Sequence, residues 1–407
     1  MTTSHLEPGE QQVYPAQAVI EEITRSPGGK IAVVTPYYHP RVGGLENYAR
    51  HSVQTLHRAG FRVVVVTSAH EGHRRVEDEV DGVRVYRLPR LVRILNTPLH
   101  PLWPIWLRSL FAREGVTAVI AHTPVPGMAD AARLARGHRP FVVTYHNDLV
   151  KSSRLGQLLC RIERHFLTGP TLAAADQIVV TSKHYSRHSS RLRQVQNKIT
   201  ISAPGVDTAL FQRTQTATIP ARLIFVGQLD RTHRHKGLDR LLEAMSAARH
   251  EVPDLSLVVV GSGNDQQRYA ARADELGIGE AVNFVGFVSN ETLRELYCSS
   301  CALVLAAEHD AEGFGMVILE AAACGVPAVA TRVGGIPAAV LDGVTGLLVQ
   351  PGDTTSLAGA LVRITQDSQL RDRLADQAHD RVMQSFSWGV QGRAVVNLMR
   401  FYQVRLS

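Results

Sequence analysis

Two glutamates with seven residues between them, Glu312 and Glu320, bracket a glycine-rich turn and the helix expected after it. Gly313 and Gly315 in this turn lack a Cβ, so a ligand can approach the backbone closely. The helix expected from about Met316 would offer unpaired N–H groups, which bind anions. Glu320 falls among apolar residues of that helix, where a carboxylate is costly unless a hydrogen-bond donor meets it. Vicinal ribose hydroxyls are such donors. The stretch therefore predicts a site for a ligand with phosphates and sugars.

This stretch closely resembles the E-x7-E donor-site motif of retaining family 4 glycosyltransferases, which have the GT-B fold. A bare pair of glutamates at this spacing is common on surface helices, so the glycines, the helix start and the apolar setting carry the resemblance. It implies that Glu320 holds the nucleotide ribose. It also implies that the transferred sugar is held by Glu312, which we place among the catalytic residues, and by the backbone of Gly313, Phe314 and Gly315.

A cationic segment is the second candidate, since six of the nine residues from Asp230 to Leu238 are charged or histidine. Lys236 stands just before a helix-prone run, where it would meet a phosphate at the helix start. The family usually has an arginine where this chain has Gln228, and arginine can fork two phosphate oxygens where glutamine cannot. Either of two nearby arginines can supply the missing charge, Arg231 or Arg234.

Further candidates follow expected strands, at the edge where open parallel sheets bind ligands. His146 comes directly after FVVTY; a structural role is the alternative, and the resemblance implies contact with the donor hexose. Asp148 is a candidate for acceptor contact. Glycine turns follow two other strands, one with Gly43 and Gly44 and one with Gly261 and Gly263. The resemblance places the first of these turns against the donor phosphates and the acceptor. The loop with Phe287 and Val288 resembles the one whose backbone reads the nucleobase.

Neither a metal nor another cofactor is expected beside the nucleotide-sugar cosubstrate. No Asp-x-Asp follows an expected strand, and residues 78–81 are expected to form a solvated polar turn. In GT-B enzymes helix ends and basic side chains carry the charge of the leaving group, as the resemblance implies here. No side chain stands out as a nucleophile or base. The resemblance accordingly implies a retaining reaction at the front face of the sugar, assisted by the leaving group.

Val- and Ile-rich segments alternate with helices, which predicts α/β architecture with parallel sheets buried on both faces. In the first half we expect strands at Lys30–Thr35, Phe61–Thr67, Val83–Leu88, Thr117–Ala121, Phe141–Tyr145, Gln177–Ser182 and Ile199–Ser202. In the second half we expect them at Arg222–Val226, Leu255–Val260, Val282–Phe284, Ala302–Ala307, Pro327–Ala330 and Gly346–Val349.

A chain of 407 residues is long for one domain, and the two strand sets predict two facing Rossmann-like domains with a cleft between them. We expect a flexible tail over residues 1–29, an acceptor-side domain over 30–212 and a nucleotide-sugar donor domain over 213–386. The segment PGVDTALF between the sets resembles the interdomain signature of the family. The resemblance also implies that a C-terminal helix, residues 387–407, crosses back onto the first domain.

Positive charge is concentrated in the first half of the chain. Residues 1–220 carry 27 Lys and Arg against 16 Asp and Glu, a net +11, whereas the remainder carries 17 against 21, a net −4. This asymmetry predicts an anionic or membrane-linked acceptor, with a merely Arg-rich composition as the alternative. The segment Leu88–Glu114 has two tryptophans and four arginines. It can rest on a membrane surface or form a core helix with solvated arginines.

The leading interpretation is a transferase that moves a hexosyl group from a UDP- or GDP-sugar to a hydroxyl acceptor in cell-envelope glycan, glycolipid or glycosylated-metabolite synthesis. A GT-B nucleotide-sugar epimerase and a non-enzymatic basic binding protein are the alternatives. Nucleic acid is not expected as a partner, because the chain shows no aromatic stacking platform. Without a signal peptide or an apolar run near 18 residues, a cytoplasmic location is expected, with peripheral contact to the inner face of a membrane left open.

Overall fold

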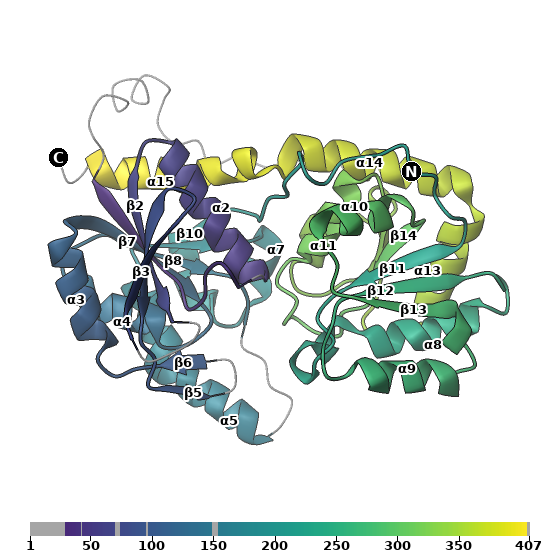
Figure 1. Cartoon of the computed structure of the whole chain (residues 1–407), viewed down its shortest axis with the longest axis horizontal. Helices are drawn as coiled ribbons and strands as arrows, with labels where there is room; N and C mark the ends of the chain where they lie inside the picture. Colours follow the sequence, from purple (N-terminus) through teal and green to yellow (C-terminus); the bar gives the residue numbers. More distant parts are fainter. Residues whose placement is uncertain (1–28, 42, 70–73, 95–96, 149–153, 405–407) are drawn as a thin grey trace, which may run out of the picture.

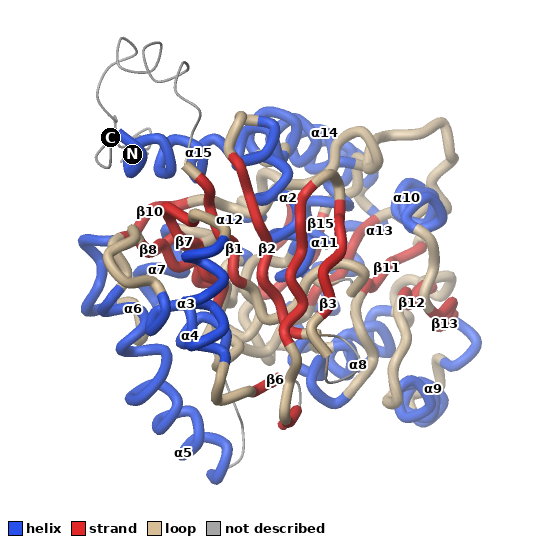
Figure 2. Tube along the Cα trace, turned by 60° about the vertical axis from the view of Figure 1, so that its left-hand side comes forward, coloured by secondary structure: helices blue, strands red, loops and turns tan. Residues whose placement is uncertain are grey.

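The described chain is built around two separate β-sheets, each with an apolar cluster on both of its faces and helices outside (Figures 1 and 2). The computed structural model describes residues 29–41, 43–69, 74–94, 97–148 and 154–404. All of the expected N-terminal tail except Gly29 lies outside the described residues. The parallel α/β architecture that the Val- and Ile-rich segments predicted is present in both halves.

The first sheet has eight strands, and its edge strand β3 runs antiparallel to β4 whereas the other neighbours are parallel. In spatial order the strands are β10 (Ile199–Ile201), β9 (Gln177–Val180), β8 (Phe141–Tyr145), β7 (Val116–Thr123), β1 (Lys30–Val34), β2 (Arg62–Ser68), β4 (Val83–Leu88) and β3 (Val76–Val80). A hairpin and the helices complete this half: β5 (Val92–Ile94), β6 (Thr97–Leu99), α2 (Gly44–Arg58), α3 (Trp103–Arg113), α4 (Met128–Ala135), α5 (Arg154–Glu163), η2 (Arg164–Thr168), α6 (Gly169–Ala174), α7 (Lys183–His188) and η3 (Arg193–Lys198).

The second sheet has six parallel strands. Their spatial order is β13 (Val282–Gly286), β12 (Ser256–Val260), β11 (Arg222–Val226), β14 (Ala302–Leu305), β15 (Ala328–Thr331) and β16 (Gly346–Val349). Its helices are η4 (Arg231–Lys236), α8 (Leu238–Ala248), α9 (Gln266–Glu275), η5 (Gly279–Ala281), α10 (Asn290–Cys298), α11 (Met316–Ala323), α12 (Ile336–Ala339), α13 (Thr354–Gln366) and α14 (Ser368–Ser385). The last helix, α15 (Trp388–Val404), packs on the first half.

The prediction of a solvated polar turn at residues 78–81 was wrong. Residues 78–80 belong to β3, and only Asp81, with a φ of 53°, lies in the turn that follows. The strand was missed because β3 is an edge strand whose side chains are nearly all exposed, so it needs no apolar alternation. Asp78 is held by Arg87 of the neighbouring strand, whose Nε lies 2.9 Å from its Oδ2.

The segment Leu88–Glu114 contains a core helix, which is the second of the two structures that its composition allowed. Helix α3 buries Trp103, Leu107 and Phe111 against the first sheet, and Trp103 Nε1 donates to the Pro89 carbonyl at 2.9 Å. Trp106 is partly buried against the same cluster. The tryptophans therefore stabilise the domain rather than facing a membrane. No helix of the described chain has both the length and the apolar character to span a bilayer.

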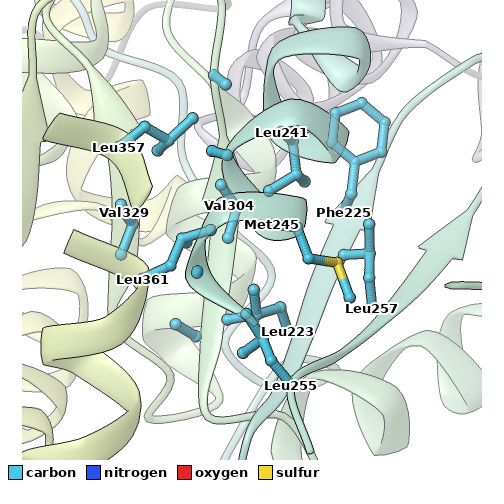
Figure 3. Packing of buried hydrophobic residues seen from close by; sticks show 14 of the residues in the cluster. Leu223, Phe225, Leu241, Met245, Leu255, Leu257, Val304, Val329, Leu357 and Leu361 are labelled. Carbon is cyan, nitrogen blue, oxygen red and sulfur yellow. The ribbon is translucent and has the colours of Figure 1, made fainter. Parts of the chain in front are cut away.

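Helix α8 is fixed on one face of the second sheet by large apolar side chains (Figure 3). Leu241 and Met245 of α8 meet Leu223 and Leu257 of the strands beneath, with Leu361 of α13 beside them. Burying such side chains stabilises a fold by about 1.5–3 kcal/mol each. Because this packing fixes the start of α8, it also fixes the basic segment η4 that comes directly before it.

The chain crosses from the second half back to the first through its last two helices (Figure 1). Helix α14 lies on the second sheet, and α15 lies on the first half beside α2. At the crossing, Val206 N–H donates to the Phe386 carbonyl at 2.7 Å, and a β-bridge joins Val206 to Ser387. The C-terminal segment therefore forms a second connection between the two halves.

Gly205→Ala should destabilise this crossing. A Cβ on Gly205 would lie 2.6 Å from the backbone nitrogen of Trp388, and backbone atoms cannot yield as a flexible side chain can. We expect a loss of about 1–3 kcal/mol in the free energy of unfolding, the range for overpacking. Urea denaturation followed by tryptophan fluorescence measures it, since Trp103, Trp106 and Trp388 are the chain's three tryptophans. Gly359→Ala, within α13 and with no atom near the added Cβ, is the control and should be neutral or stabilising. Equal stability of both variants would contradict the close contact.

Candidate functional site

Three loops that are distant in sequence meet between the two halves, each at the carboxyl end of a strand. Gly44, the first residue of α2, faces the start of α11, because a Cβ on Gly44 would lie 3.8 Å from Met316 Sδ. In the loop after β8, Asn147 Nδ2 donates to the Ala311 carbonyl at 2.9 Å. The N-terminal ends of α2 and α11 therefore come together, and both attract negative charge.

A partly buried ion pair joins a basic and an acidic candidate of the second half, Lys236 and Glu312. Lys236 Nζ lies 2.7 Å from Glu312 Oε2, and the two side chains are 18% and 10% exposed. Glu312 Oε1 also accepts a hydrogen bond from Gly315 N–H at 3.1 Å. Burial would raise the pKa of Glu312, but the charge and hydrogen bond of Lys236 hold that pKa below its ordinary value. The carboxylate is therefore ionised and fixed at the start of α11.

Glu320 lies on α11 and accepts a hydrogen bond from the Tyr297 hydroxyl at 3.0 Å. Burial raises the pKa of Glu320, and the bond from Tyr297 and the charge of Lys236 partly offset that rise. A tyrosine of α10, which sequence reasoning missed, thus donates to this carboxylate from within the protein. Tyr297 itself is fully buried, so it holds the carboxylate in one orientation.

The Gly-Phe-Gly turn brings backbone rather than side chains to the junction of the two halves. A Cβ on Gly313 would lie 2.9 Å from the His146 carbonyl of the first half. Gly315 has a φ of 78°, in the left-handed region that favours glycine. The ring of Phe314 is buried and faces Phe386, with ring centroids 5.8 Å apart. Phe314 can therefore contact a ligand at this turn through its backbone alone.

His146 is paired with a second histidine that sequence reasoning missed. Its Nε2 lies 3.0 Å from Nδ1 of His122, a fully buried residue of β7, and the two rings are stacked. Burial lowers the pKa of His146 to about 4 and lowers that of His122 well below its ordinary value, so both rings are neutral at pH 7. His122 Nε2 has no partner among the described residues.

One placement of the two ring protons avoids a buried N–H group without an acceptor in the neutral histidine pair. A buried nitrogen without a partner is tolerated better as an acceptor than as an N–H donor. We therefore assign the proton of His122 to Nδ1, which donates to Nε2 of His146. The proton of His146 is then carried by Nδ1, its other ring nitrogen. Tyr48 meets both rings edge-on, at centroid distances of 5.0 Å and 6.1 Å, and keeps the pair in place.

The carboxylate of Asp148, the candidate for acceptor contact, is already hydrogen-bonded to side chains of its own domain. Its Oδ1 accepts hydrogen bonds from the Tyr145 hydroxyl at 2.5 Å and from the Ser189 hydroxyl at 2.9 Å. Arg191 Nε lies 3.8 Å from the same oxygen. Its carboxylate therefore stabilises the loop after β8, which carries His146.

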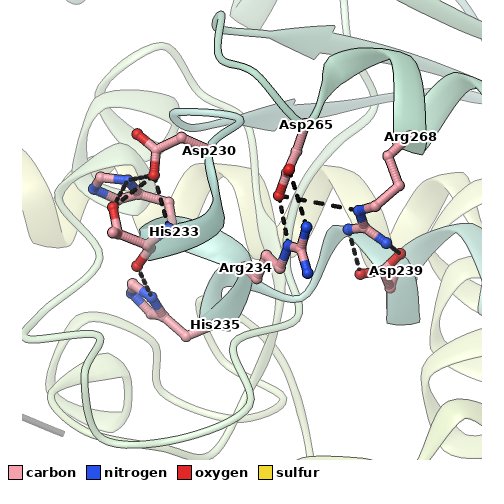
Figure 4. Close-up of polar contacts among 8 residues, drawn as sticks. Asp230, His233, Arg234, His235, Asp239, Asp265 and Arg268 are labelled. Atoms are coloured by element: carbon pink, nitrogen blue, oxygen red, sulfur yellow. Dashed lines mark hydrogen bonds and ion pairs between the residues drawn. The ribbon is translucent and has the colours of Figure 1, made fainter. Parts of the chain in front are cut away.

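The two arginines that could replace the one missing at Gln228 differ in their surroundings. Arg234 forms a bidentate pair with Asp265, at 2.5 Å and 3.0 Å (Figure 4). Arg231 is exposed, and no ion pair or hydrogen bond within the described chain involves its side chain. Gln228 is exposed as well. Arg231 is therefore the arginine that can reach a ligand without breaking an existing pair.

The remaining candidates are two glycines, which lie in close contact with a neighbouring loop, and the loop with Phe287 and Val288. Cβ atoms on Gly261 and Gly263 would lie 1.9 Å from the Gly227 carbonyl oxygen and 2.2 Å from that of Leu229. The close approach expected there is thus made to the chain's own neighbouring loop. At the end of β13, Phe287 is 78% exposed whereas Val288 is partly buried against the core. An aromatic face so exposed is available for stacking.

Two family models match successive parts of the chain. The model for glycosyltransferase family 4 matches residues 42–210, and the model for glycosyl transferases group 1 matches residues 207–381. The chain belongs to glycosyltransferase family 4. Both models are of transferases, which favours transfer over the epimerase and binding-protein alternatives. The matches meet in the loop between the two sheets, near the expected domain boundary.

Relatives of this glycosyltransferase cover its length to different extents. It is 36% identical to a D-inositol 3-phosphate glycosyltransferase of Corynebacterium jeikeium over 202 residues, 48% of this chain and 48% of that protein. It is 27% identical to the GDP-mannose-dependent α-(1-6)-phosphatidylinositol monomannoside mannosyltransferase of Mycolicibacterium smegmatis over 90% of this chain and 97% of that protein. This chain therefore matches about half the length of the first relative and nearly all of the second.

Solved structures confirm the predicted GT-B fold with its two Rossmann-like domains. Sucrose-phosphate synthase from Thermosynechococcus elongatus superposes with a TM-score of 0.75 at 25% identity, over 93% of this chain and 100% of that one. HepE of Anabaena, solved in complex with UDP-glucose, superposes with a TM-score of 0.67 at 19% identity, over 91% and 99%. The three loops described above meet where the two domains of this glycosyltransferase adjoin.

The residues of this glycosyltransferase site that the sequence did not indicate are partners of those that it did. His122, Tyr297 and Asp265 hold His146, Glu320 and Arg234 respectively. Each lies on another strand, helix or loop, so no local pattern marks it. A buried histidine in the strand preceding β8 was the one available signal, because a polar ring in a buried strand needs a partner. No cluster of three or more metal-ligating side chains occurs in the described part of the chain.

His122→Phe should make the glycosyltransferase less sensitive to acid. Burial depresses the pKa of His122, so below about pH 6.5, the ordinary histidine value, the unfolded chain takes up a proton that the folded protein does not. The contribution of the neutral His122 to the free energy of unfolding is therefore fully present above that pH. It is lost as the pH falls toward the pKa of His122 in the folded protein. The free energy of unfolding, measured by urea titration at pH 7 and pH 5, should fall less in the variant than in the wild type. An equal fall in both would contradict a neutral, buried His122.

Proposed function

We propose that this chain is a retaining glycosyltransferase that transfers a hexosyl group from a UDP- or GDP-sugar to a hydroxyl acceptor. The acceptor would belong to cell-envelope glycan, glycolipid or glycosylated-metabolite synthesis. The observation that carries the proposal is the Lys236–Glu312 pair at the start of α11. A nucleoside diphosphate sugar brings phosphates that compete for the lysine and hydroxyls that compete for the carboxylate. The lysine and the carboxylate, which are in direct contact, can therefore bind the phosphates and the sugar hydroxyls of one ligand.

The donor is proposed to lie along the second domain. Glu320 accepts hydrogen bonds from the ribose, and Glu312 with the backbone of Gly313 and Gly315 holds the hexose. The loop with Phe287 meets the nucleobase, and the exposed ring adds a stacking surface, which is worth about 1–3 kcal/mol per base. The complex of HepE with UDP-glucose, on the same fold, supports a donor of this class.

The chemistry is proposed to rest on the leaving group. The bond between the anomeric carbon and the diphosphate oxygen breaks, and the diphosphate takes the electron pair. The acceptor hydroxyl attacks on the same face of the sugar and passes its proton to a phosphate oxygen. His146, neutral by virtue of its low pKa, donates a hydrogen bond to a hexose hydroxyl without adding a second positive charge beside Lys236.

The charge that develops on the leaving diphosphate is proposed to be met without a divalent metal. Lys236, Arg231 and the N-terminal end of α11 are the cationic and dipolar groups of this site. Arg231 takes the place of the arginine that the family usually has at Gln228. Turnover that survives EDTA, in buffers depleted of metal, is the measurement that supports metal independence.

Glu320→Ala should weaken binding of the matching nucleoside diphosphate by about 1.5–3 kcal/mol, the range for a hydrogen bond to a charged group. Thermal shift with UDP, GDP and ADP identifies the base, and calorimetry with wild type and variant gives the difference. Release of the nucleoside diphosphate from each sugar nucleotide then identifies the sugar. Glu295→Ala, an exposed glutamate of α10 in the same domain, is the matched control. Unchanged affinity in the Glu320 variant, with the fold intact by circular dichroism, would refute the ribose contact.

Arg231→Gln should lower turnover of the nucleotide sugar by about tenfold or more, because one charge-assisted hydrogen bond is worth about 1.5–3 kcal/mol. Arg234→Gln should lower it less, because Arg234 is already bound to Asp265. Initial rates at saturating donor measure both effects. A larger effect at Arg234 would show that the Asp265 pair opens when the donor binds, and would assign the missing arginine to Arg234.

A further inference from the structure

A recess in the first domain lies outside the donor contacts described above. It lies at the carboxyl ends of β1, β2 and β4, three neighbouring strands of the first sheet, and it is open to solvent. Six of its lining residues carry the argument, four arginines and two tyrosines: Arg41, Arg87, Arg90, Arg93, Tyr37 and Tyr38. None of the lining residues in the described chain is acidic. The recess is thus a concentration of positive charge at the ligand-binding edge of the sheet.

Two arginines of the recess, Arg87 and Arg41, are held in place by neighbouring groups of the same domain. Arg87 is only 10% exposed, pairs with Asp78 at 2.9 Å and donates to the His39 carbonyl at 2.6 Å. Arg41 pairs with Glu46 at 3.0 Å and lies over the ring of Tyr37, 3.9 Å from its centroid. Fixed guanidinium groups lose little conformational entropy when they bind a ligand.

Two tyrosine hydroxyls in the wall of the recess are buried without a partner. Neither Tyr37 Oη nor Tyr38 Oη has a hydrogen-bond partner within the described chain, and Tyr38 is only 3% exposed. Such groups are rare in folded proteins and indicate a missing acceptor. Burial raises the pKa of both tyrosines, so both hydroxyls keep their protons at neutral pH and can donate.

We propose that this recess binds a phosphate ester group of the acceptor. The inference rests on the proposed function and adds the chemical class of the acceptor. Four arginines and two tyrosines line it, and a phosphate offers three oxygens that accept hydrogen bonds from guanidinium groups in pairs.

The position of the recess fits an acceptor site rather than a second donor site. Tyr37 and Arg41 lie on the loop between β1 and α2, and the same loop ends at Gly44, which faces Met316 of the donor domain. One short loop therefore connects the recess with the place where the two domains adjoin. An acceptor held by its phosphate in the recess would extend a hydroxyl along this loop toward the hexose. Lys236, the lysine proposed for the donor diphosphate, belongs to the other domain.

The first test is calorimetric titration of inorganic phosphate into the protein saturated with UDP or GDP, whichever the thermal-shift panel selects. The nucleotide occupies the donor site, so the remaining binding reports the recess. Arg90→Gln with Arg93→Gln should weaken phosphate binding by about tenfold or more, as expected for lost charge-assisted bonds. The control is Arg108→Gln with Arg161→Gln, two exposed arginines of the same domain outside the recess. Absence of phosphate binding, or equal weakening by the control, would overturn the proposal.

A second variant separates a ligand role from a structural one. Tyr38→Phe removes a buried hydroxyl that has no partner, so the midpoint of thermal unfolding should stay the same or rise. Phosphate binding should weaken in this variant. A lowered midpoint with unchanged phosphate binding would assign the hydroxyl to the fold and overturn its place in the site.

Two further arms identify the source of the phosphate. Glucose 6-phosphate should compete with inorganic phosphate whereas glucose should not, which would indicate a soluble phosphate ester. Competition by phosphatidylinositol vesicles but not by phosphatidylcholine vesicles would instead indicate a lipid headgroup. Competition by none of these probes would overturn the assignment to phosphate esters. Failure of every nucleotide to bind would contradict the proposed function alone, because phosphate titration of the nucleotide-free protein still tests the recess.

Discussion

The ion pair between Lys236 and Glu312 is the interaction around which the donor site is arranged. Removing two charges from water is costly, so a buried pair persists only where its geometry is well supported. The lysine is positioned by the packing of α8 on the second sheet, and the carboxylate is positioned by Gly315 N–H at the start of α11. The second sheet and helices α8 and α11 must therefore be in place before the pair can form. A ligand that pairs with both charges therefore meets side chains that the fold already holds in position.

The second constraint is the close approach of the two domains. Gly44 faces Met316, Gly313 lies against the His146 carbonyl, and Asn147 donates to the Ala311 carbonyl. A side chain at Gly313 would hold the domains apart, because its Cβ would lie 2.9 Å from the His146 carbonyl oxygen. The return of the chain through α15 adds a second connection, so the relative position of the domains depends on contacts at both places. His146 from one domain and Glu312 from the other thereby meet at the same junction.

The two domains contribute different electrostatics to this junction. The donor domain provides an ionised pair and a helix N-terminal end, which suit a diphosphate. The first domain provides a neutral histidine pair at the centre and a concentration of arginines further along the same edge of its sheet. This distribution gives a physical basis for the excess of positive charge in residues 1–220, which the Arg-rich segment before α3 carries in part. The tryptophans of that segment serve the core instead.

Local patterns in the sequence determined much of this protein. Glycines before a helix, a carboxylate in an apolar helix and runs of Val and Ile depend on neighbours within a few residues, so the E-x7-E turn, Lys236 and nearly every strand were predictable. Edge strand β3 and the short hairpin of β5 and β6 were not, because largely exposed strands need no apolar alternation. His122, Tyr297 and the choice between Arg231 and Arg234 were also decided by the tertiary structure alone. Their partners lie 23 or more residues away in sequence, and only folding brings such groups within hydrogen-bond distance.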